Sequence, residues 1–208
     1  MKIWIPRQDH PAIAAAAIQL ALNHEVTTSD ALSDLCDPGH VKPMLSGIDL
    51  MICDALPPST IESEEDIIDQ SARAAYVALE AAVAAGTTRA VLVSNLSCFE
   101  NYPSEFVIDE SWRPRPFPEA SSLAPLMAER TFREFARQGP IESICLRFGA
   151  LDVEGGTPIS LAVEAIVRSC KMPIEQDSYR WWLFHIADSP RFPLRATTSA
   201  PMQLGGGG

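Results

Sequence analysis

The chain has 208 residues, of which 47% are hydrophobic and 21% are charged, values typical of globular proteins. Lys and Arg number 16 against 27 for Asp and Glu, which gives a formal net charge of −11. This balance argues against nucleic-acid binding and against attachment to an anionic membrane, since both need basic clusters. No apolar run approaches the roughly 20 residues that cross a bilayer, and no signal-peptide core is visible, so we expect a cytoplasmic protein.

The five cysteines are odd in number, scattered and free of any C-x-x-C pair, so the sequence indicates neither disulfides nor zinc. No cluster of His, Asp and Glu has metal-ligand spacing, and we expect no metal. Buried, reduced thiols are the expected state of Cys36, Cys53, Cys98, Cys145 and Cys170.

Short apolar runs alternate with helical stretches along the chain. Strands are expected at 3–5, 24–28, 49–53, 90–93, 144–148 and 182–186, and helices at 12–22, 64–85, 125–138 and 158–170. This alternation predicts an α/β fold: a Rossmann-like, doubly wound parallel sheet with helices on both faces.

Helix ends are marked by capping residues. Ser63 is expected to cap helix 64–85, and Gly86 to end it. Ser121 or Ser122 is expected to cap helix 125–138, with Pro125 in its first turn and a glycine at its end.

Five segments together resemble the extended short-chain dehydrogenase/reductase family, the NAD-dependent epimerase/dehydratase group. They are SGIDLMICDAL (46–56), ALEAAVAAGTTRAVLVSNLSCF (78–99), DESWRPRPFPEAS (109–121), AERTFREFARQGPIESICLRFGALDVEGG (128–156) and RWWLFHIADSP (180–190). Their order and spacing match the family over about 2–190. The resemblance implies an NAD(P) cofactor held by a glycine-rich turn after the first strand.

That turn departs from the family pattern. The segment 6–10 contains no glycine, and the first glycine of the chain is Gly39. Side chains at the close-approach positions should block the usual pyrophosphate pose, and Asp9 adds negative charge there. We therefore expect no standard NAD(P) binding.

The family's catalytic groups are also absent. No lysine follows a tyrosine by four residues, so the Tyr-x-x-x-Lys pair is missing. Ser121 aligns with the tyrosine and Pro125 with the lysine. Asn95 aligns with the family's Ser or Thr, although Ser94 or Ser97 takes that place if the register slips.

Other candidates keep two interpretations each. Asp30 occupies the family's ribose-binding position, or is a helix cap or solvated charge. Arg7 and His10 bind an anion with their side chains, or lie on the surface. Arg147 belongs to the family's substrate pocket, or forms a structural ion pair. His185, in an apolar strand, is expected to be a core histidine.

Surfaces for partners are also indicated. The aromatic-rich segment 99–117 and the pair Trp181–Trp182 are expected to line a pocket or an interface. In the family two long helices pair across a dimer; here these are 64–85 and 125–138, and the Ala-rich face 72–85 suits close contact.

We expect one Rossmann-like domain over 1–204, in which about 150–204 is a reduced C-terminal substrate region, and a disordered glycine tail at 205–208.

The leading hypothesis is a degenerate family member, a pseudoenzyme without standard NAD(P) binding or catalysis. It would be a structural, regulatory or ligand-binding subunit, a homodimer or bound to a partner protein, with a nucleotide or sugar nucleotide as a possible ligand. The alternative is an active NAD(P)-dependent oxidoreductase or sugar-nucleotide epimerase with an unconventional site, in which Arg7 and His10 bind phosphate and Asn95 or Ser94 lies near the substrate.

Overall fold

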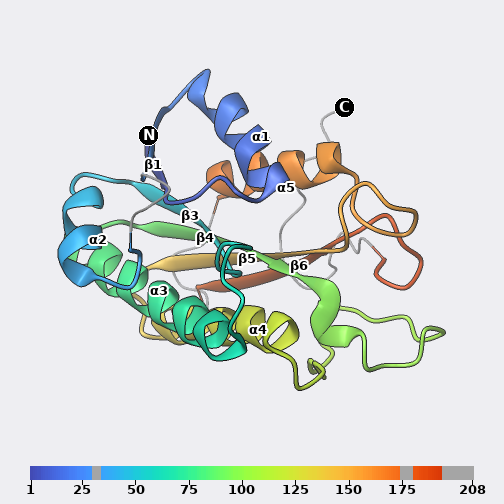
Figure 1. The fold of residues 1–208 in the computed structure, drawn as a ribbon. Helices are drawn as coiled ribbons and strands as arrows, with labels where there is room; N and C mark the ends of the chain where they lie inside the picture. Colours follow the sequence, from blue (N-terminus) through green and yellow to red (C-terminus); the bar gives the residue numbers. More distant parts are fainter. Residues whose placement is uncertain (30–33, 174–179, 194–208) are drawn as a thin grey trace.

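The computed structural model describes residues 1–29, 34–173 and 180–193. Within them, six strands form one parallel sheet in the order β2-β1-β3-β4-β5-β6 (Figure 1). The chain moves outward from β1 to β2 and then returns to β3 on the other side of β1. The carboxyl ends of β1 and β3 therefore form the topological switch point, where open α/β sheets bind ligands.

The elements follow one another as strand and helix. The strands are β1 (Lys2–Ile5), β2 (Glu25–Thr28), β3 (Leu50–Asp54), β4 (Arg89–Asn95), β5 (Glu142–Phe148) and β6 (Trp181–Ile186). The helices are α1 (Pro11–Ala21), α2 (Pro38–Met44), α3 (Glu64–Ala85), α4 (Ala120–Arg137) and α5 (Ile159–Lys171), with a 3-10 turn η1 (Leu96–Phe99).

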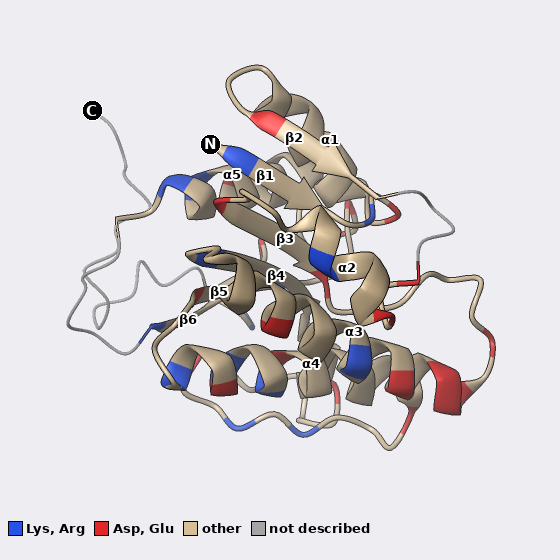
Figure 2. Cartoon of the chain, turned by 90° about the vertical axis from the view of Figure 1, so that its left-hand side faces the viewer, with Lys and Arg blue, Asp and Glu red and all other residues tan. Residues whose placement is uncertain are grey.

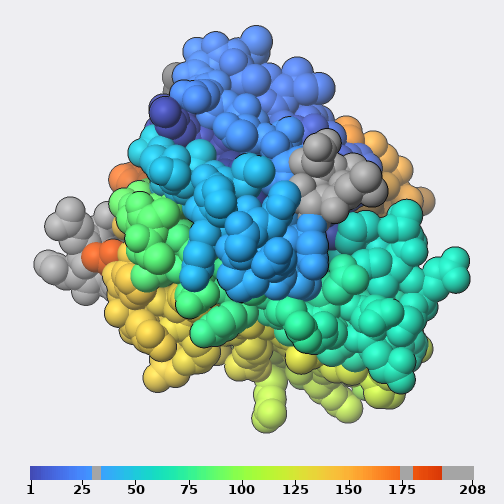
Figure 3. Space-filling model, turned by 60° about the vertical axis from the view of Figure 1, so that its left-hand side comes forward, coloured from blue at the N-terminus to red at the C-terminus, as the bar shows by residue number. Residues whose placement is uncertain are grey.

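The sheet lies between two helix layers. Helices α1 and α5 cover one face, and α2, α3 and α4 cover the other (Figure 1). Each layer closes its own apolar core against alternating side chains of the same strands, such as Ile52 on the α1 side and Cys53 on the α3 side. In the space-filling view, α2 and α3 form adjoining parts of one face (Figure 3). Burial on both faces explains why the central strands are continuously apolar.

The predicted fold class is confirmed, and so are most element positions. Helix α3 has the predicted bounds, Ser63 accepts a hydrogen bond from the Asp66 amide, and Gly86 ends the helix with φ of 81°. Four cysteines are buried, and Cys36 is half-buried. The short helix α2 was not expected, because its seven residues include two prolines and carry too little apolar pattern to predict a helix.

The start of α4 corrects one prediction. The helix begins at Ala120 after Glu119, so Ser121 and Ser122 lie inside it and do not cap it. Pro125 lies in the second turn instead of the first. A proline costs least near the start of a helix, and Pro125 removes only one backbone hydrogen bond there.

The expected domain boundaries stay predictions, and the glycine tail at 205–208 lies outside the described residues. Among the helices that the structure describes, none has the length and apolarity that crossing a membrane requires.

Candidate functional site

The turn between β1 and α1 lies at the switch point and contains two charged candidates. Arg7 is half-buried, and its Nη2 donates a hydrogen bond of 2.5 Å to the carbonyl oxygen of Leu56, just after β3. This bond joins the β1–α1 turn to the β3–α3 segment across the mouth of the switch point. Arg7 is thus bound to the protein at the place where the glycine-rich turn of the family would meet a pyrophosphate.

His10 precedes α1 and is half-buried. Its ring centroid lies 6.0 Å from that of Phe148, and its Nδ1 is buried without a hydrogen-bond partner. Burial lowers the pKa of His10, although the nearby Asp54 carboxylate opposes this shift. The imidazole therefore favours its neutral form, which is a poor ligand for phosphate.

Asp54, at the end of β3, is a residue that the sequence did not single out. Burial raises the pKa of Asp54, against the effects of the Leu56 amide that donates to its Oδ1 and of the positive charges on His10 and Arg7. The signal available in the sequence was an acidic residue at the end of a buried strand. Parallel topology brings such a residue to the same sheet edge as the β1–α1 turn.

A small cavity lies beside Arg7 and Asp54, on the α3 side of the sheet. This cavity of about 20 Å³ is lined by Arg7, Asp54 and Ser71 together with apolar side chains of α3 and α4. Room for about one water is available. Ser71 is itself bound, because its hydroxyl lies within hydrogen-bond distance of the carbonyl oxygens of Ala55 and Ala124 and can donate its proton to either. Asp30, the expected ribose ligand, lies outside the described residues.

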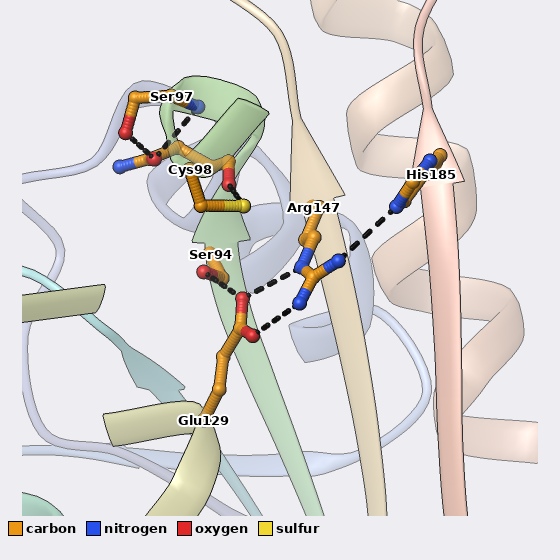
Figure 4. A network of polar contacts seen from close by, with 7 residues as sticks. Ser94, Ser97, Cys98, Glu129, Arg147 and His185 are labelled. Atoms are coloured by element: carbon orange, nitrogen blue, oxygen red, sulfur yellow. Dashed lines mark hydrogen bonds and ion pairs between the residues drawn. The ribbon is translucent and has the colours of Figure 1, made fainter. Parts of the chain in front are cut away.

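A second polar centre lies between β4, α4, β5 and β6 (Figure 4). Arg147 on β5 forms a two-point ion pair with Glu129 on α4: Nη2 to Oε2 is 2.6 Å and Nε to Oε1 is 2.8 Å. The hydroxyl of Ser94 donates to Oε1 of the same carboxylate at 2.7 Å. Arg147 and Glu129 are 3% and 4% exposed, so this pair is a structural ion pair inside the core.

His185 on β6 completes the network. Nη1 of Arg147 lies 3.2 Å from Nε2 of His185, and because a guanidinium only donates, this nitrogen must accept. Burial and the charge of Arg147 lower the pKa of His185 to about 3. Phe99 packs against both, with its centroid 5.1 Å from the imidazole and 5.1 Å from the guanidinium carbon. The expected core histidine is confirmed: His185 is a neutral core residue.

The positions aligned with the family's catalytic residues do not come together. Ser121 is exposed and Pro125 is buried against the core. Ser94 is bound to Glu129, and the amide oxygen of Asn95 accepts hydrogen bonds from the backbone and hydroxyl of Ser97. Glu129, one turn beyond Pro125 in α4, is buried, and its carboxylate is directed at the sheet, where it meets Arg147 and Ser94.

A larger cavity of about 410 Å³ opens at the carboxyl ends of β4 and β5. It is lined by η1 with its flanking residues, by the loop 148–156 and by Arg191 and Phe192. Asn95 and Ser97 are among the lining residues, but Arg147 is not. Its size lies within the range of small-molecule sites.

The loop 149–156 that borders this cavity is tightly held. A Cβ added to Gly156 would lie 2.1 Å from the carbonyl oxygen of Ala150, so only glycine fits. The hydroxyl of Thr157 accepts a hydrogen bond from the Gly149 amide at 2.7 Å and donates to the Ile186 carbonyl at 2.5 Å. These contacts fix the wall of the cavity before any ligand enters.

Among the described residues, no group of three or more His, Cys, Asp or Glu side chains has metal-binding geometry.

Several solved structures have a similar fold. A uronate dehydrogenase mutant is 18% identical with a TM-score of 0.72, covering 89% of this chain and 74% of that one. MoeE5 in complex with UDP-glucuronic acid and NAD is 17% identical, with a TM-score of 0.72 over 90% and 76%. The UDP-glucose 4-epimerase of Thermotoga maritima with UDP-glucose is 13% identical, with a TM-score of 0.76 over 90% and 77%.

This chain has the fold of the extended short-chain dehydrogenases/reductases. It spans about three quarters of the length of these structures. No protein-family model matches the chain, and no curated protein matches it in sequence. The expected fold relationship is confirmed at the level of structure.

Proposed function

We propose that the chain is a degenerate member of this family, a pseudoenzyme that does not bind NAD(P) in the usual mode and works as a binding or structural subunit. The observation that carries the proposal is the Arg7–Leu56 contact at the switch point, made from a β1–α1 turn that contains no glycine. Solved structures with this fold contain NAD, so NAD(P) is the cofactor to test.

The second polar centre supports the same proposal. Where the family would have a tyrosine and a lysine on α4, this helix presents Ser121 to solvent and Pro125 to the core. Glu129 of α4 is buried, and its negative charge is neutralised by the ion pair with Arg147. No side chain of this centre is left to exchange a proton with a substrate hydroxyl.

Calorimetric titration tests the proposal. The folded protein should release no heat with millimolar NAD+, NADH, NADP+ or NADPH, and the purified protein should show no bound-nucleotide absorbance near 260 nm. Micromolar binding of any dinucleotide would overturn the proposal.

The switch point also supports an alternative, an active NAD(P)-dependent oxidoreductase or sugar-nucleotide epimerase with an unconventional site. Arg7, His10 and Asp54 lie together there, and burial shifts the pKa values of His10 and Asp54 toward each other. Under this alternative, Arg7→Ala abolishes nucleotide binding and Asp54→Asn abolishes turnover. Under our proposal, neither the parent protein nor Arg7→Ala binds a nucleotide detectably.

We further propose that the subunit works as a homodimer through α3 and α4. Both helices cross between neighbouring parallel strands, so they run in the same direction, and a second copy related by a twofold axis presents them reversed. Acidic residues occupy the start of α3, and arginines occupy the end of α4 (Figure 2). Reversal brings these opposite charges together.

Apolar groups on this face support the pairing. Tyr76 on α3 is 53% exposed and makes an edge contact with Phe135 on α4, with centroids 5.7 Å apart. Met127, also on α4, is exposed as well. The Ala-rich face itself is mostly used within the subunit, since Ala75, Ala78 and their neighbours are buried.

Light scattering after gel filtration tests the dimer. Tyr76→Asp should convert a dimer to a monomer, whereas Ile18→Asp, a matched change at an exposed aliphatic residue of α1 on the other layer, should not. A monomeric parent protein, or a dimer broken equally by both variants, contradicts the interface.

A further inference from the structure

The cavity of about 410 Å³ at the carboxyl ends of β4 and β5 has a wall that is set by protein contacts. The Gly149 amide donates to the Thr157 hydroxyl at 2.7 Å, and Gly156 is packed too closely for any other residue. A ligand would therefore bind without first ordering the loop 149–156, which lowers the entropic cost of binding.

The lining is mostly apolar and partly aromatic. Leu96 from η1 and Val153 from the loop line the cavity, and Phe148 and Phe192 add ring surfaces. These side chains offer a ligand no hydrogen bonds, so they favour an apolar body that displaces water from them.

Arg191 lines the same cavity as a fixed cation. Its Nη2 donates to the carbonyl oxygens of Phe99 at 3.0 Å and Tyr102 at 2.9 Å, and its guanidinium carbon lies 5.4 Å from the ring centroid of Phe192. The two carbonyl oxygens occupy both protons of Nη2, so the plane of the guanidinium is oriented before a ligand binds.

The other nitrogens of Arg191 have no partner, and its charge has no counter-ion. Nε is buried without a hydrogen-bond partner, and Nη1 makes no hydrogen bond to a described residue. No carboxylate in the described part of the chain forms an ion pair with this half-buried guanidinium. A partly desolvated charge that only neutral carbonyl oxygens contact favours an anionic ligand.

Asn95 adds a second donor, at the end of β4. Its Oδ1 accepts a hydrogen bond from the backbone amide of Ser97 at 3.1 Å, and because that amide only donates, the other terminal atom of the side chain is the donor Nδ2. Within the described residues, Nδ2 has no acceptor. Arg191 and Asn95 therefore give one cavity two donors without acceptors, and a carboxylate supplies two acceptor oxygens.

Two carboxylates limit the charge that such a ligand can carry. Glu100 and Glu154 also line the cavity, and both are exposed to solvent. Water and salt screen exposed charges, so these groups reduce the attraction between Arg191 and one negative charge without cancelling it. Their repulsion grows with the charge of the ligand, which disfavours a diphosphate or another polyanion.

We propose that this cavity binds a small organic monocarboxylate with an apolar body. This inference rests on the proposed function, because it gives the subunit a ligand-binding role at a site that needs no dinucleotide. The carboxylate accepts hydrogen bonds from Arg191 and Asn95, and the apolar body packs against Phe148 and Phe192.

Four probes test the proposal. Phenylacetate, 2-phenylacetamide and 2-phenylethylamine share one body and differ in charge, and glucuronate has the carboxylate on a polar body. Binding is followed by the amide resonances of Gly155 and Gly156, which line the cavity. We expect phenylacetate to bind about fivefold more tightly than 2-phenylacetamide, the difference between a charge-assisted and a neutral hydrogen bond, and the other two probes to bind least.

The net charge of the protein makes this comparison strict. At −11, general electrostatic attraction favours the amine, so a preference for phenylacetate cannot arise from it. Equal or tighter binding of the amide, the amine or glucuronate would overturn the proposal.

A matched pair of variants tests the role of Arg191. Arg191→Gln removes the positive charge and should abolish the fivefold preference for phenylacetate over 2-phenylacetamide, while the affinity for the neutral amide stays the same. Arg73→Gln removes an exposed arginine of α3, which does not line the cavity, and should leave the preference unchanged. A preference that survives Arg191→Gln, or that both variants abolish, would overturn the site.

Asn95→Asp decides the case if Arg191→Gln also loses the neutral amide because the contacts with Phe99 and Tyr102 are broken. This variant keeps the acceptor for Ser97 and replaces Nδ2 by an oxygen. It should weaken phenylacetate at least fivefold and 2-phenylacetamide less, because only the acid is repelled by the new charge. Equal affinities of the parent protein and Asn95→Asp for phenylacetate would overturn the proposal.

The two proposals fail separately. Titration with NAD+ reports on the switch point whatever phenylacetate does. Tight NAD+ binding overturns the proposed function, and absent phenylacetate binding overturns only this inference.

Discussion

The switch point and the Glu129–Arg147 centre both contain ionisable side chains, but the two regions bury them differently. At the switch point, the half-buried Arg7 makes one hydrogen bond, to a carbonyl oxygen. Each region also contains a histidine whose Nδ1 is buried without a partner, His10 in the first and His185 in the second. In the Glu129–Arg147 centre, the carboxylate accepts three hydrogen bonds, and the guanidinium contacts a second strand as well.

The difference separates half-buried charges with one contact from fully buried charges with several. A buried charge is tolerated where every polar atom has a partner, and then its removal is costly. A half-buried charge with one contact contributes little stability and can be replaced. We therefore expect substitutions in the second region to lower stability more than substitutions in the first.

The largest expected effect is at Arg147. Replacing it with alanine leaves the Glu129 carboxylate buried and unpaired, and should lower the free energy of unfolding by about 3–5 kcal/mol in urea titration. The double variant Glu129→Leu/Arg147→Met should recover most of this loss, because an apolar pair needs no partners. Arg137→Ala, which breaks an exposed pair with Glu134, is the control and should cost less than about 1 kcal/mol. If Arg147→Ala lowered the free energy of unfolding as little as Arg137→Ala does, the contrast between the two regions would be wrong.

The next effect is the pH dependence caused by His185. Its folded pKa of about 3 lies below the 6.5 of an exposed histidine, so the unfolded state binds the proton first. Its contribution is fully present above pH 6.5 and is lost as the pH falls toward 3, with about 2 kcal/mol lost at pH 5. His185→Gln keeps an acceptor for Arg147 and should show a correspondingly shallower loss between pH 7.5 and pH 5. If the parent protein and His185→Gln lost the same free energy of unfolding between pH 7.5 and pH 5, the buried imidazole would not be neutral.

The smallest effect is at Arg7. Arg7→Ala removes one half-buried hydrogen bond and should lower the free energy of unfolding by about 1 kcal/mol. The variant Arg7→Lys keeps the positive charge, but its side chain does not reproduce the hydrogen bond to Leu56, so it should lower the free energy of unfolding by a similar amount. A loss close to that of Arg147→Ala would show that the switch point is also part of the structural core.

The sequence predicted the fold well because periodicity and capping are local signals. Ser63, Gly86 and the acidic first turn define α3 without help from the rest of the chain. The start of α4 was wrong because the serine cap signal near Pro125 competed with tertiary contacts that extend the helix back to Ala120.

The candidate site was predicted less completely, because its partners are distant in sequence. Arg147 was a candidate, but its partner Glu129 was not singled out, and the choice between an ion pair and a pocket residue needed the contact between β5 and α4. Asp54 and Arg191 carry no local motif. Their roles depend on which loops the parallel sheet brings to one edge.

The place of β6 in the sheet has a consequence for synthesis. Among the strands that the structure describes it is the last in the sequence, and it lies at the edge of the sheet beside β5. Its His185 follows Arg147 by 38 residues. At a translation rate of about 5–20 residues per second, β6 is synthesised about 2–8 s after β5. The Glu129–Arg147 pair needs only α4 and β5, so it assembles within that interval. Until β6 arrives, the outer edge of β5 has open backbone groups, and the nascent chain is most prone to associate with other strands there.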